Sequence, residues 1–233
     1  MLHWQDRESM VKLARDYPQV KFVHVNYVLP DLEELPENVY GIFNDDFAGA
    51  YQATEYLLSK GCRNPVFLEI QIKDETYRAR REGFLAALRD NEISGRVYMQ
   101  KDPKGTLDER VAMHYRFFAE VVRATPNIDG VLTCYDPMAE AVRIFINDHE
   151  RYNKLGLLSY DGYIETRSSS LNTISVRYAE MGRKAVKLLD SPENKPRFQR
   201  ILPQLIIKKR NRNKLDIKKL SQEKEPALAE LIT

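Results

Sequence analysis

Apolar residues along the chain follow two spacings in turn, and each spacing predicts one kind of element. Short apolar runs are typical of buried strands, whereas apolar positions three and four apart are typical of helices. Strands are expected at residues 20–26, 39–43, 65–70, 96–100, 129–133, 155–159 and 201–208, with a short extended piece around Ser175. Helices are expected at residues 6–17, 47–60, 75–90, 107–124, 139–149 and 178–189. Because the two kinds alternate, we predict an α/β protein whose parallel sheets carry helices on both faces.

Local signals indicate where some of these helices begin. Asp136 is expected as an N-cap and Pro137 as the first helical residue, where a missing N–H costs nothing. Asp45 or Asp46 is expected to cap the helix that starts at Phe47. The strand that runs directly into the helix after Asp136 is half of a βαβ unit, and ligands of such sheets lie at the carboxyl ends of the strands. The expected packing face of the last helix consists of Gly182, Ala185, Val186 and Leu189.

The composition is typical of a globular protein. Hydrophobic residues make up 43% of the 233-residue chain and charged residues 30%, and the net charge of +2 argues neither for nor against a nucleic-acid partner. Cys62 and Cys134 are too few for a disulfide framework, so a reducing compartment is expected. The first residues lack the apolar segment of a signal peptide, and no apolar run reaches the roughly 20 residues of a membrane span. We therefore expect a cytoplasmic protein without a membrane partner.

No motif of an enzyme or a metal site occurs in the sequence. The chain has no G-x-S-x-G, P-loop or G-x-G-x-x-G motif. The spacing of His3, His24, His114 and His149 is not that of metal ligands. We therefore expect no catalytic residue, no cofactor and no metal.

Five short motifs follow one another along the chain. They are D-D-F-A-G at 45–49 with G-C-R at 61–63, R-R-E-G-F at 80–84, Y-D-P-M-A at 135–139, S-Y-D-G at 159–162, and L-N-T-I at 171–174 with E-M-G-R-K-A at 180–185. Each motif alone has little specificity, but their order and spacing resemble the effector-binding part of LacI/GalR transcription regulators. The resemblance extends from about residue 20 to about residue 210.

This resemblance implies a periplasmic-binding-protein-like type I fold with two Rossmann-like subdomains, each built on a parallel sheet. The first subdomain is expected to be incomplete, because the family's helix-turn-helix headpiece, hinge helix and first third of the N-terminal subdomain have no counterpart here. We expect residues 1–98 and about 162–180 in the N-terminal subdomain, about 99–161 and 180–210 in the C-terminal subdomain, and 211–233 as a basic and polar tail.

The resemblance also implies a ligand site. Arg80 lies at the position where the family has an arginine whose guanidinium donates hydrogen bonds to two ligand oxygens. The alternative is an arginine on the solvated face of a helix. Asp161 aligns with a ligand-binding aspartate whose carboxylate accepts from vicinal hydroxyls, and the alternative is an N-cap for residues 163–167. Tyr135 replaces a residue that is often Asn in the family, and it can stack on a sugar or a base.

Three further residues lie near the expected cleft. Asn26 ends the first strand and is a weaker ligand candidate. Tyr77 is expected as a ligand-binding aromatic, and Tyr77 and Tyr160 otherwise belong to the core. Asp136 is favoured as a helix cap near the cleft over a ligand contact.

We therefore expect a domain that senses a sugar or a similar polar metabolite for a LacI/GalR-type regulator. The resemblance implies a homodimer that contacts DNA only through a headpiece absent from this chain. The alternative is a solute-binding protein that serves a transporter or a sensor kinase. The basic run at 208–219 is interpreted as a solvated tail, with DNA contact as the minor alternative.

Overall fold

The computed structural model describes residues 7–28, 31–162, 171–190 and 196–208. Its helices are α1 (Arg7–Asp16), α2 (Asp46–Ser59), α3 (Glu75–Asp90), α4 (Leu107–Ala124), α5 (Asp136–Asp148) and α6 (Tyr178–Asp190), with 3-10 turns η1 (Leu32–Glu34) and η2 (Glu150–Tyr152). Its strands are β1 (Phe22–Asn26), β2 (Val39–Asn44), β3 (Pro65–Gln71), β4 (Arg96–Lys101), β5 (Gly130–Thr133), β6 (Gly156–Asp161), β7 (Thr173–Ser175), β8 (Phe198–Ile201) and β9 (Gln204–Ile206). The expected α/β fold with parallel sheets is confirmed.

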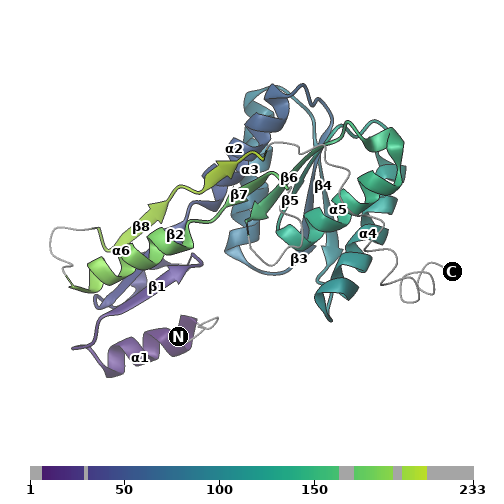
Figure 1. The fold of residues 1–233 in the computed structure, drawn as a ribbon. Helices are drawn as coiled ribbons and strands as arrows, with labels where there is room; N and C mark the ends of the chain where they lie inside the picture. Colours follow the sequence, from purple (N-terminus) through teal and green to yellow (C-terminus); the bar gives the residue numbers. More distant parts are fainter. Residues whose placement is uncertain (1–6, 29–30, 163–170, 191–195, 209–233) are drawn as a thin grey trace.

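The larger sheet has the strand order β4-β3-β5-β6-β7-β9. All neighbouring strands are parallel except β9, which runs antiparallel to β7. Helices α2 and α3 pack together on one side of this sheet, and α4 and α5 pack together on the other (Figure 1). The layers enclose a core of fully buried side chains that includes Phe67, Phe84, Phe118, Leu132 and Leu158.

A smaller, fully parallel sheet has the order β1-β2-β8 and lies beside the larger one (Figure 1). Helix α6 packs against β1 and β2. Helix α1 contributes Met10 and Ala14 to a separate apolar cluster with Leu35 and Val39. The side-chain amide of Asn38 donates to carbonyl oxygens of residues 14, 17 and 20 at 2.8–3.1 Å and ties the end of α1 to β2.

The chain passes between the two sheets at three places: between β2 and α2, between β7 and α6, and between β8 and β9. Strands β2, β7 and β8 all end at these crossings, so the carboxyl ends of both sheets face their junction. The backbone N–H of Asp45 donates to the Ile201 carbonyl at 2.9 Å and joins two of the crossings. Ligands of parallel α/β sheets bind at the carboxyl ends of the strands, so a ligand site is expected at this junction.

The sheets divide the chain differently from the expected subdomains. Strands β3 and β4 lie in the larger sheet, because β3 pairs with both β4 and β5. Helix α6 and strand β8 lie with the smaller sheet, although they were expected in the C-terminal subdomain. The division after the first two strands therefore falls near residue 45 and not at residue 98. The expected tail at 211–233 lies outside the described residues.

Three local expectations need correction. The single strand expected at 201–208 is instead β8 and β9, separated at Leu202 and Pro203, because proline cannot donate to a sheet ladder. Helix α5 begins at Asp136 itself, and the extended residue Tyr135 occupies the N-cap position. The buried face of α6 consists of Met181, Ala185 and Leu188, whereas Val186 is 66% exposed and a Cβ on Gly182 would contact nothing within 4 Å.

Candidate functional site

Arg80 on α3 is the centre of a buried polar cluster at the carboxyl ends of the larger sheet. Arg80 is only 4% exposed, which excludes the alternative that it lies on the solvated face of the helix. The guanidinium Nε donates to Asp46 Oδ1 at 2.8 Å, Nη1 donates to the Cys134 carbonyl at 2.5 Å, and Nη2 pairs with Asp161 Oδ1 at 2.8 Å. One planar fork thus joins the start of α2, the end of β5 and the end of β6.

The neighbouring arginines of α3 behave differently. Arg78 is half-exposed and pairs with Glu75 and Glu82 of its own helix. Arg81 reaches Glu69 of β3 at 2.9 Å. Of the three arginines around this helical turn, only Arg80 points into the junction, which agrees with its place in the R-x-x-G-F motif.

Asp46 was expected only as a possible helix cap, and its role was missed. Asp45 is the N-cap of α2, and its carboxylate accepts from the Ala48 N–H at 3.1 Å. Asp46 is therefore free of the capping role, and its buried carboxylate accepts from Asn44 Nδ2 at 2.9 Å and from Arg80. The only signal in the sequence was the pair of adjacent acids where one cap suffices.

Asp161 combines charge with an uncommon backbone conformation. It ends β6 with a φ of +96°, a left-handed region that costs free energy for any residue other than glycine and is least costly for Asn and Asp. Such conformations are concentrated at functional sites. The residues 163–167 that Asp161 was alternatively expected to cap lie outside the described part of the chain.

The charges of the cluster depend on one another. Burial raises the pKa of Asp46 and of Asp161, and the charge of Arg80 opposes this rise in both. Burial also disfavours the charged form of Arg80, but Asp161 and Asp46 outweigh it and hold the pKa of Arg80 well above its ordinary value. The arginine therefore stays charged and holds both carboxylates in place.

Two tyrosines line the guanidinium. The guanidinium carbon of Arg80 lies 3.8 Å from the ring centroid of Tyr160 and 5.5 Å from that of Tyr77. Tyr160 is fully buried, and its hydroxyl donates to the Asp46 carbonyl at 3.3 Å. Burial raises the pKa of Tyr77, and the charges of Arg80 and Asp161 also act on it. Cation–π contact of this kind stabilises a desolvated guanidinium.

Tyr135 and Asp136 also lie at this edge of the sheet. Tyr135 is 8% exposed, and its hydroxyl is hydrogen-bonded to Nε2 of His114 on α4. Asp136 is 2% exposed, its carboxylate accepts from the Ser159 hydroxyl of β6, and it is the first residue of α5, whose N-cap position belongs to Tyr135. As an acid in the first turn of α5, Asp136 still interacts favourably with the helix dipole.

Four of the five expected ligand residues thus lie close together, since Arg80 contacts Asp161, the ring of Tyr77 and the carbonyl of Cys134, which directly precedes Tyr135. Asn26 lies in the smaller sheet, where it ends β1 with a φ of +86° and pairs in register with Phe43. No contact described for the resolved part of the chain joins Asn26 to the Arg80 cluster. Asn26 and Asp161 nevertheless share the same feature, a left-handed residue at the carboxyl end of a parallel strand.

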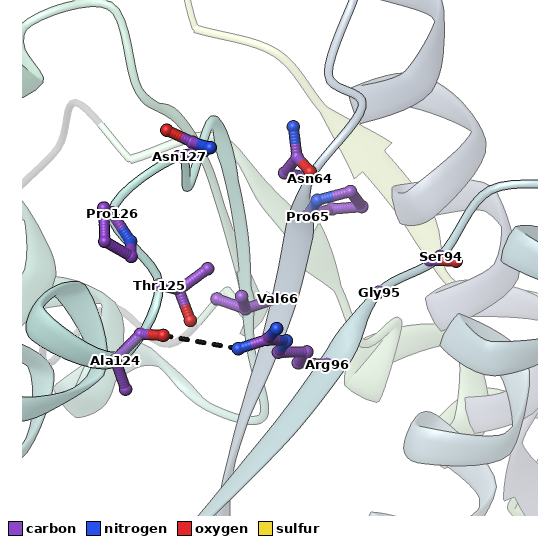
Figure 2. Close-up of a pocket in the computed structure, with 10 residues that line it drawn as sticks. All are labelled: Asn64, Pro65, Val66, Ser94, Gly95, Arg96, Ala124, Thr125, Pro126 and Asn127. Atoms are coloured by element: carbon purple, nitrogen blue, oxygen red, sulfur yellow. Dashed lines mark hydrogen bonds between the residues drawn. The ribbon is translucent and has the colours of Figure 1, made fainter.

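A separate cavity of about 240 Å³ lies at the opposite edge of the larger sheet (Figure 2). It is lined where β3 and β4 begin and α4 ends, by Asn64–Val66, Ser94–Arg96 and Ala124–Asn127. Arg96 Nη1 donates across it to the Ala124 carbonyl at 3.3 Å. None of the expected ligand residues lines this cavity. Within the described residues there is also no group of three side chains that could hold a metal ion, and no helix is long and apolar enough to cross a membrane.

His114 gives the fold a measurable pH dependence. Burial lowers its pKa to about 4, helped by the charge of Arg110 and opposed by Asp102. The unfolded chain binds the proton near the ordinary value of about 6.5, so stability is lost as the pH falls from about 6.5 to about 4. Each pKa unit corresponds to about 1.4 kcal/mol, so the loss is about 3 kcal/mol.

We expect the variant His114→Gln to show a smaller loss of stability over this range than the unaltered chain. Urea unfolding of both proteins at pH 7 and pH 5 measures the difference, and other titrating groups cancel in the comparison. Equal pH dependence of the two proteins would contradict the assignment of a buried, neutral His114.

The model of the periplasmic binding protein-like domain family matches residues 54–209. The HTH-type transcriptional regulator MalR of Streptococcus pneumoniae is 24% identical over 217 residues, which are 89% of this chain and 61% of MalR. The chain thus spans about three fifths of the length of this curated relative.

Solved structures show the same fold. A LacI family transcriptional regulator from Enterococcus faecium with bound ribose matches with a TM-score of 0.66 at 20% identity, covering 86% of this chain and 73% of that one. The transcriptional regulator CelR in complex with cellobiose matches with a TM-score of 0.64 at 19% identity, covering 88% and 62%. A periplasmic binding protein/LacI transcriptional regulator from Alkaliphilus metalliredigens with D-xylulofuranose matches with a TM-score of 0.63 at 16% identity, covering 85% and 80%. The chain belongs to the periplasmic binding protein-like domain family, and its fold is that of the effector-binding domain of LacI family regulators.

Proposed function

We propose that this chain is the effector-sensing part of a LacI/GalR-type transcription regulator, and that it binds a small sugar-like compound where the two sheets meet. The observation that supports this most strongly is the Arg80 cluster at the carboxyl ends of the larger sheet, with Asp161 at its accessible side. The side chain of Asp161 is 14% exposed, against 5% for Arg80 and 2% for Asp46. Asp161 is therefore the charged group of the cluster that a ligand in the junction would reach first.

The hydrogen-bonding chemistry of the cluster suits a neutral polyol. Three carboxylates, those of Asp46, Asp136 and Asp161, accompany the single guanidinium of Arg80. Three of the five N–H donors of Arg80 already go to described protein groups, which leaves up to two for a ligand oxygen. Carboxylates accept from vicinal hydroxyls, and tyrosine rings pack against the apolar face of a sugar.

The likeness to sugar-bound regulators points in the same direction. Ligand binding would favour the conformers in which the two sheets, with their helices, close around the ligand. This shift of the population toward the closed state would be the signal. By the same resemblance we propose a cytoplasmic homodimer without enzymatic activity. We further propose that the whole regulator contacts DNA through residues outside this chain.

Binding of sugars to the purified chain tests the proposal. We expect at least one of D-ribose, D-xylulose and cellobiose to raise the melting temperature, and to titrate with one site per chain in calorimetry. A ligand at 100 times its Kd stabilises the folded state by about 2.7 kcal/mol, which is readily measured. Failure of every neutral sugar at millimolar concentration, or binding only of metabolites without hydroxyl groups, would contradict the proposal.

The substitution Asp161→Asn tests whether the Asp161 carboxylate binds the ligand. Asparagine tolerates the left-handed backbone and keeps the shape of the side chain but loses the charge. We expect affinity for the sugar that binds to fall about tenfold or more, since a charge-assisted hydrogen bond contributes about 1.5–3 kcal/mol. Asp129→Asn is a matched control, because Asp129 lies at the other end of the sheet, where its carboxylate accepts from the N–H groups of Arg63 and Asn64. Unchanged affinity in Asp161→Asn, measured by calorimetry, would remove Asp161 from the site.

A further inference from the structure

A chain of hydrogen bonds leads from the partly exposed Gln100 of β4 through the buried His114 of α4 to Tyr135. Nε2 of Gln100 donates to the Met113 carbonyl at 3.3 Å, Oε1 of Gln100 lies 2.6 Å from Nδ1 of His114, and Nε2 of His114 is bonded to the Tyr135 hydroxyl. The rings of His114 and Tyr135 meet edge to face with centroids 5.4 Å apart. His114 is completely buried, and Gln100 and Tyr135 hydrogen-bond to its two ring nitrogens.

The direction of every bond in this chain follows from its first member. A backbone carbonyl can only accept, so the NH2 group of Gln100 faces Met113 and the amide oxygen faces His114. An amide oxygen also only accepts, so Nδ1 of His114 carries a proton. In a neutral imidazole Nε2 is then an acceptor, and the Tyr135 hydroxyl must donate to it. The proton of Tyr135 thus points away from the cluster, and only lone pairs of its oxygen remain.

The surroundings of His114 favour the neutral ring that this argument requires. Burial lowers its pKa to about 4, and Arg110, one turn earlier on α4, adds to this effect. Asp102, which follows β4, acts in the opposite direction. The ring is therefore neutral at physiological pH.

We propose that His114 is a positioning residue which, held by Gln100, makes Tyr135 a hydrogen-bond acceptor toward the ligand, so that the site selects a hydroxyl that donates at this point. This inference rests on the proposed function, because it assumes that the ligand lies beside Tyr135. Tyr135 directly follows Cys134, whose carbonyl accepts from the same guanidinium that pairs with Asp161, and Tyr135 keeps 8% of its surface exposed. Tyr135 and the carboxylate of Asp161 then present two acceptors to one ligand, which matches a sugar diol and disfavours its methyl ether.

The hydrogen bonds from Gln100 through His114 to Tyr135 are called the relay below. Their direction can be tested without any ligand. In the chain labelled with ¹⁵N-histidine, long-range ¹H–¹⁵N spectra at pH 7 should show His114 with a protonated Nδ1 and an unprotonated Nε2, its signals being assigned by their loss in His114→Gln. The opposite tautomer, or an imidazolium at pH 7, would overturn the proposal.

Gln100→Glu should reverse the hydrogen bonds at a pH below the pKa of His114 in this variant. A carboxylate at this position favours the imidazolium, whose Nε2–H then donates to Tyr135 and leaves the tyrosine proton free to point toward the ligand. We expect the same spectra, recorded over a pH series, to show His114 protonated at a pH at least one unit higher than in the unaltered chain, where its pKa is about 4. An unchanged titration of His114 would overturn the contact with Gln100 on which the proposal rests.

The ligand arm uses whichever of D-ribose, D-xylulose and cellobiose binds the unaltered chain, together with its mono-O-methyl ethers. We expect Tyr135→Phe to weaken binding of the sugar about fivefold to tenfold, and one methyl ether to bind the unaltered chain poorly. In Gln100→Glu, at a pH below the raised pKa of His114, the affinity of this ether relative to the parent sugar should increase, because the hydroxyl of Tyr135 can then donate to the ether oxygen.

Tyr115→Phe is the control, because the Tyr115 hydroxyl bonds to Asp148 at 3.0 Å and takes no part in the relay. Equal affinity of the Tyr135→Phe variant and the unaltered chain would overturn the ligand role of the relay. If no sugar binds, the proposed function fails and this ligand role fails with it, whereas the spectra still report the relay itself, so the two failures are distinguishable.

Discussion

Arg80→Ala should lower the free energy of unfolding by about 3–5 kcal/mol, one of the two largest effects that we expect from a single substitution. The side chains of Arg80 and Asp46 are nearly inaccessible to water, and Asp161 is only slightly more exposed. Removal of the guanidinium leaves both carboxylates and the Cys134 carbonyl without this donor. A buried charge that has lost its partner costs much more than the ion pair contributed in net terms.

Arg78→Ala is the matched control. Arg78 lies two residues before Arg80 on the same helix, and this variant also loses three donated hydrogen bonds, but at an exposed position. Its ion pairs with Glu75 and Glu82 are exposed, so we expect a change within about 0.5 kcal/mol. Urea unfolding of both variants gives the comparison. A loss below about 1 kcal/mol for Arg80→Ala would mean that the two carboxylates are solvated or protonated in the folded protein.

Gly83→Ala should be the other strongly destabilising substitution, with a loss of about 2 kcal/mol or more. A Cβ at Gly83 would lie 2.2 Å from the Phe47 carbonyl oxygen and 3.0 Å from the Tyr51 nitrogen. Both are backbone atoms of α2, so α2 and α3 would have to move apart, and Arg80 on the preceding turn of α3 would move away from Asp46.

Gly182→Ala should raise the free energy of unfolding, in contrast to Gly83→Ala. Gly182 lies inside α6, and a Cβ there meets nothing within 4 Å. Alanine should therefore stabilise the helix by about 0.5–1 kcal/mol. Thermal and urea unfolding of the two glycine variants measure the contrast, and a similar change in both would contradict the close approach of α2 and α3.

The sequence predicted local structure well, because its signals are local. The alternation of strands and helices, and the helix α3 with Arg80 and Gly83, follow from apolar spacing and from the R-x-x-G-F motif. It predicted pairing poorly, since nothing near β3 says that its neighbour is β5 and not β2. The buried face of α6 was misjudged because apolar residues occur on two sides of that helix, and only the tertiary structure shows that Met181 and Leu188 are inside and Val186 is outside.

The motifs placed Arg80, Asp161 and Tyr135 in the sequence, and the structure brings these three residues close together. Their role toward a ligand stays a prediction. Asp46 lies in the first motif but was considered only as a cap, and His114 lies in none; the roles of both arise from contacts with residues 34 and 21 positions away in the chain. Asp136 was misjudged as an N-cap because Ser159, its partner, is distant in sequence and satisfies the carboxylate inside the protein.

A crystal structure of this chain with the neutral sugar that binds it most tightly in calorimetry would test the ligand site directly. We expect the sugar at the junction of the two sheets, with hydroxyl groups within hydrogen-bond distance of the Asp161 carboxylate and the Tyr135 oxygen. A sugar bound instead in the cavity between the beginnings of β3 and β4, or one that touches neither Asp161 nor Tyr135, would contradict this expectation.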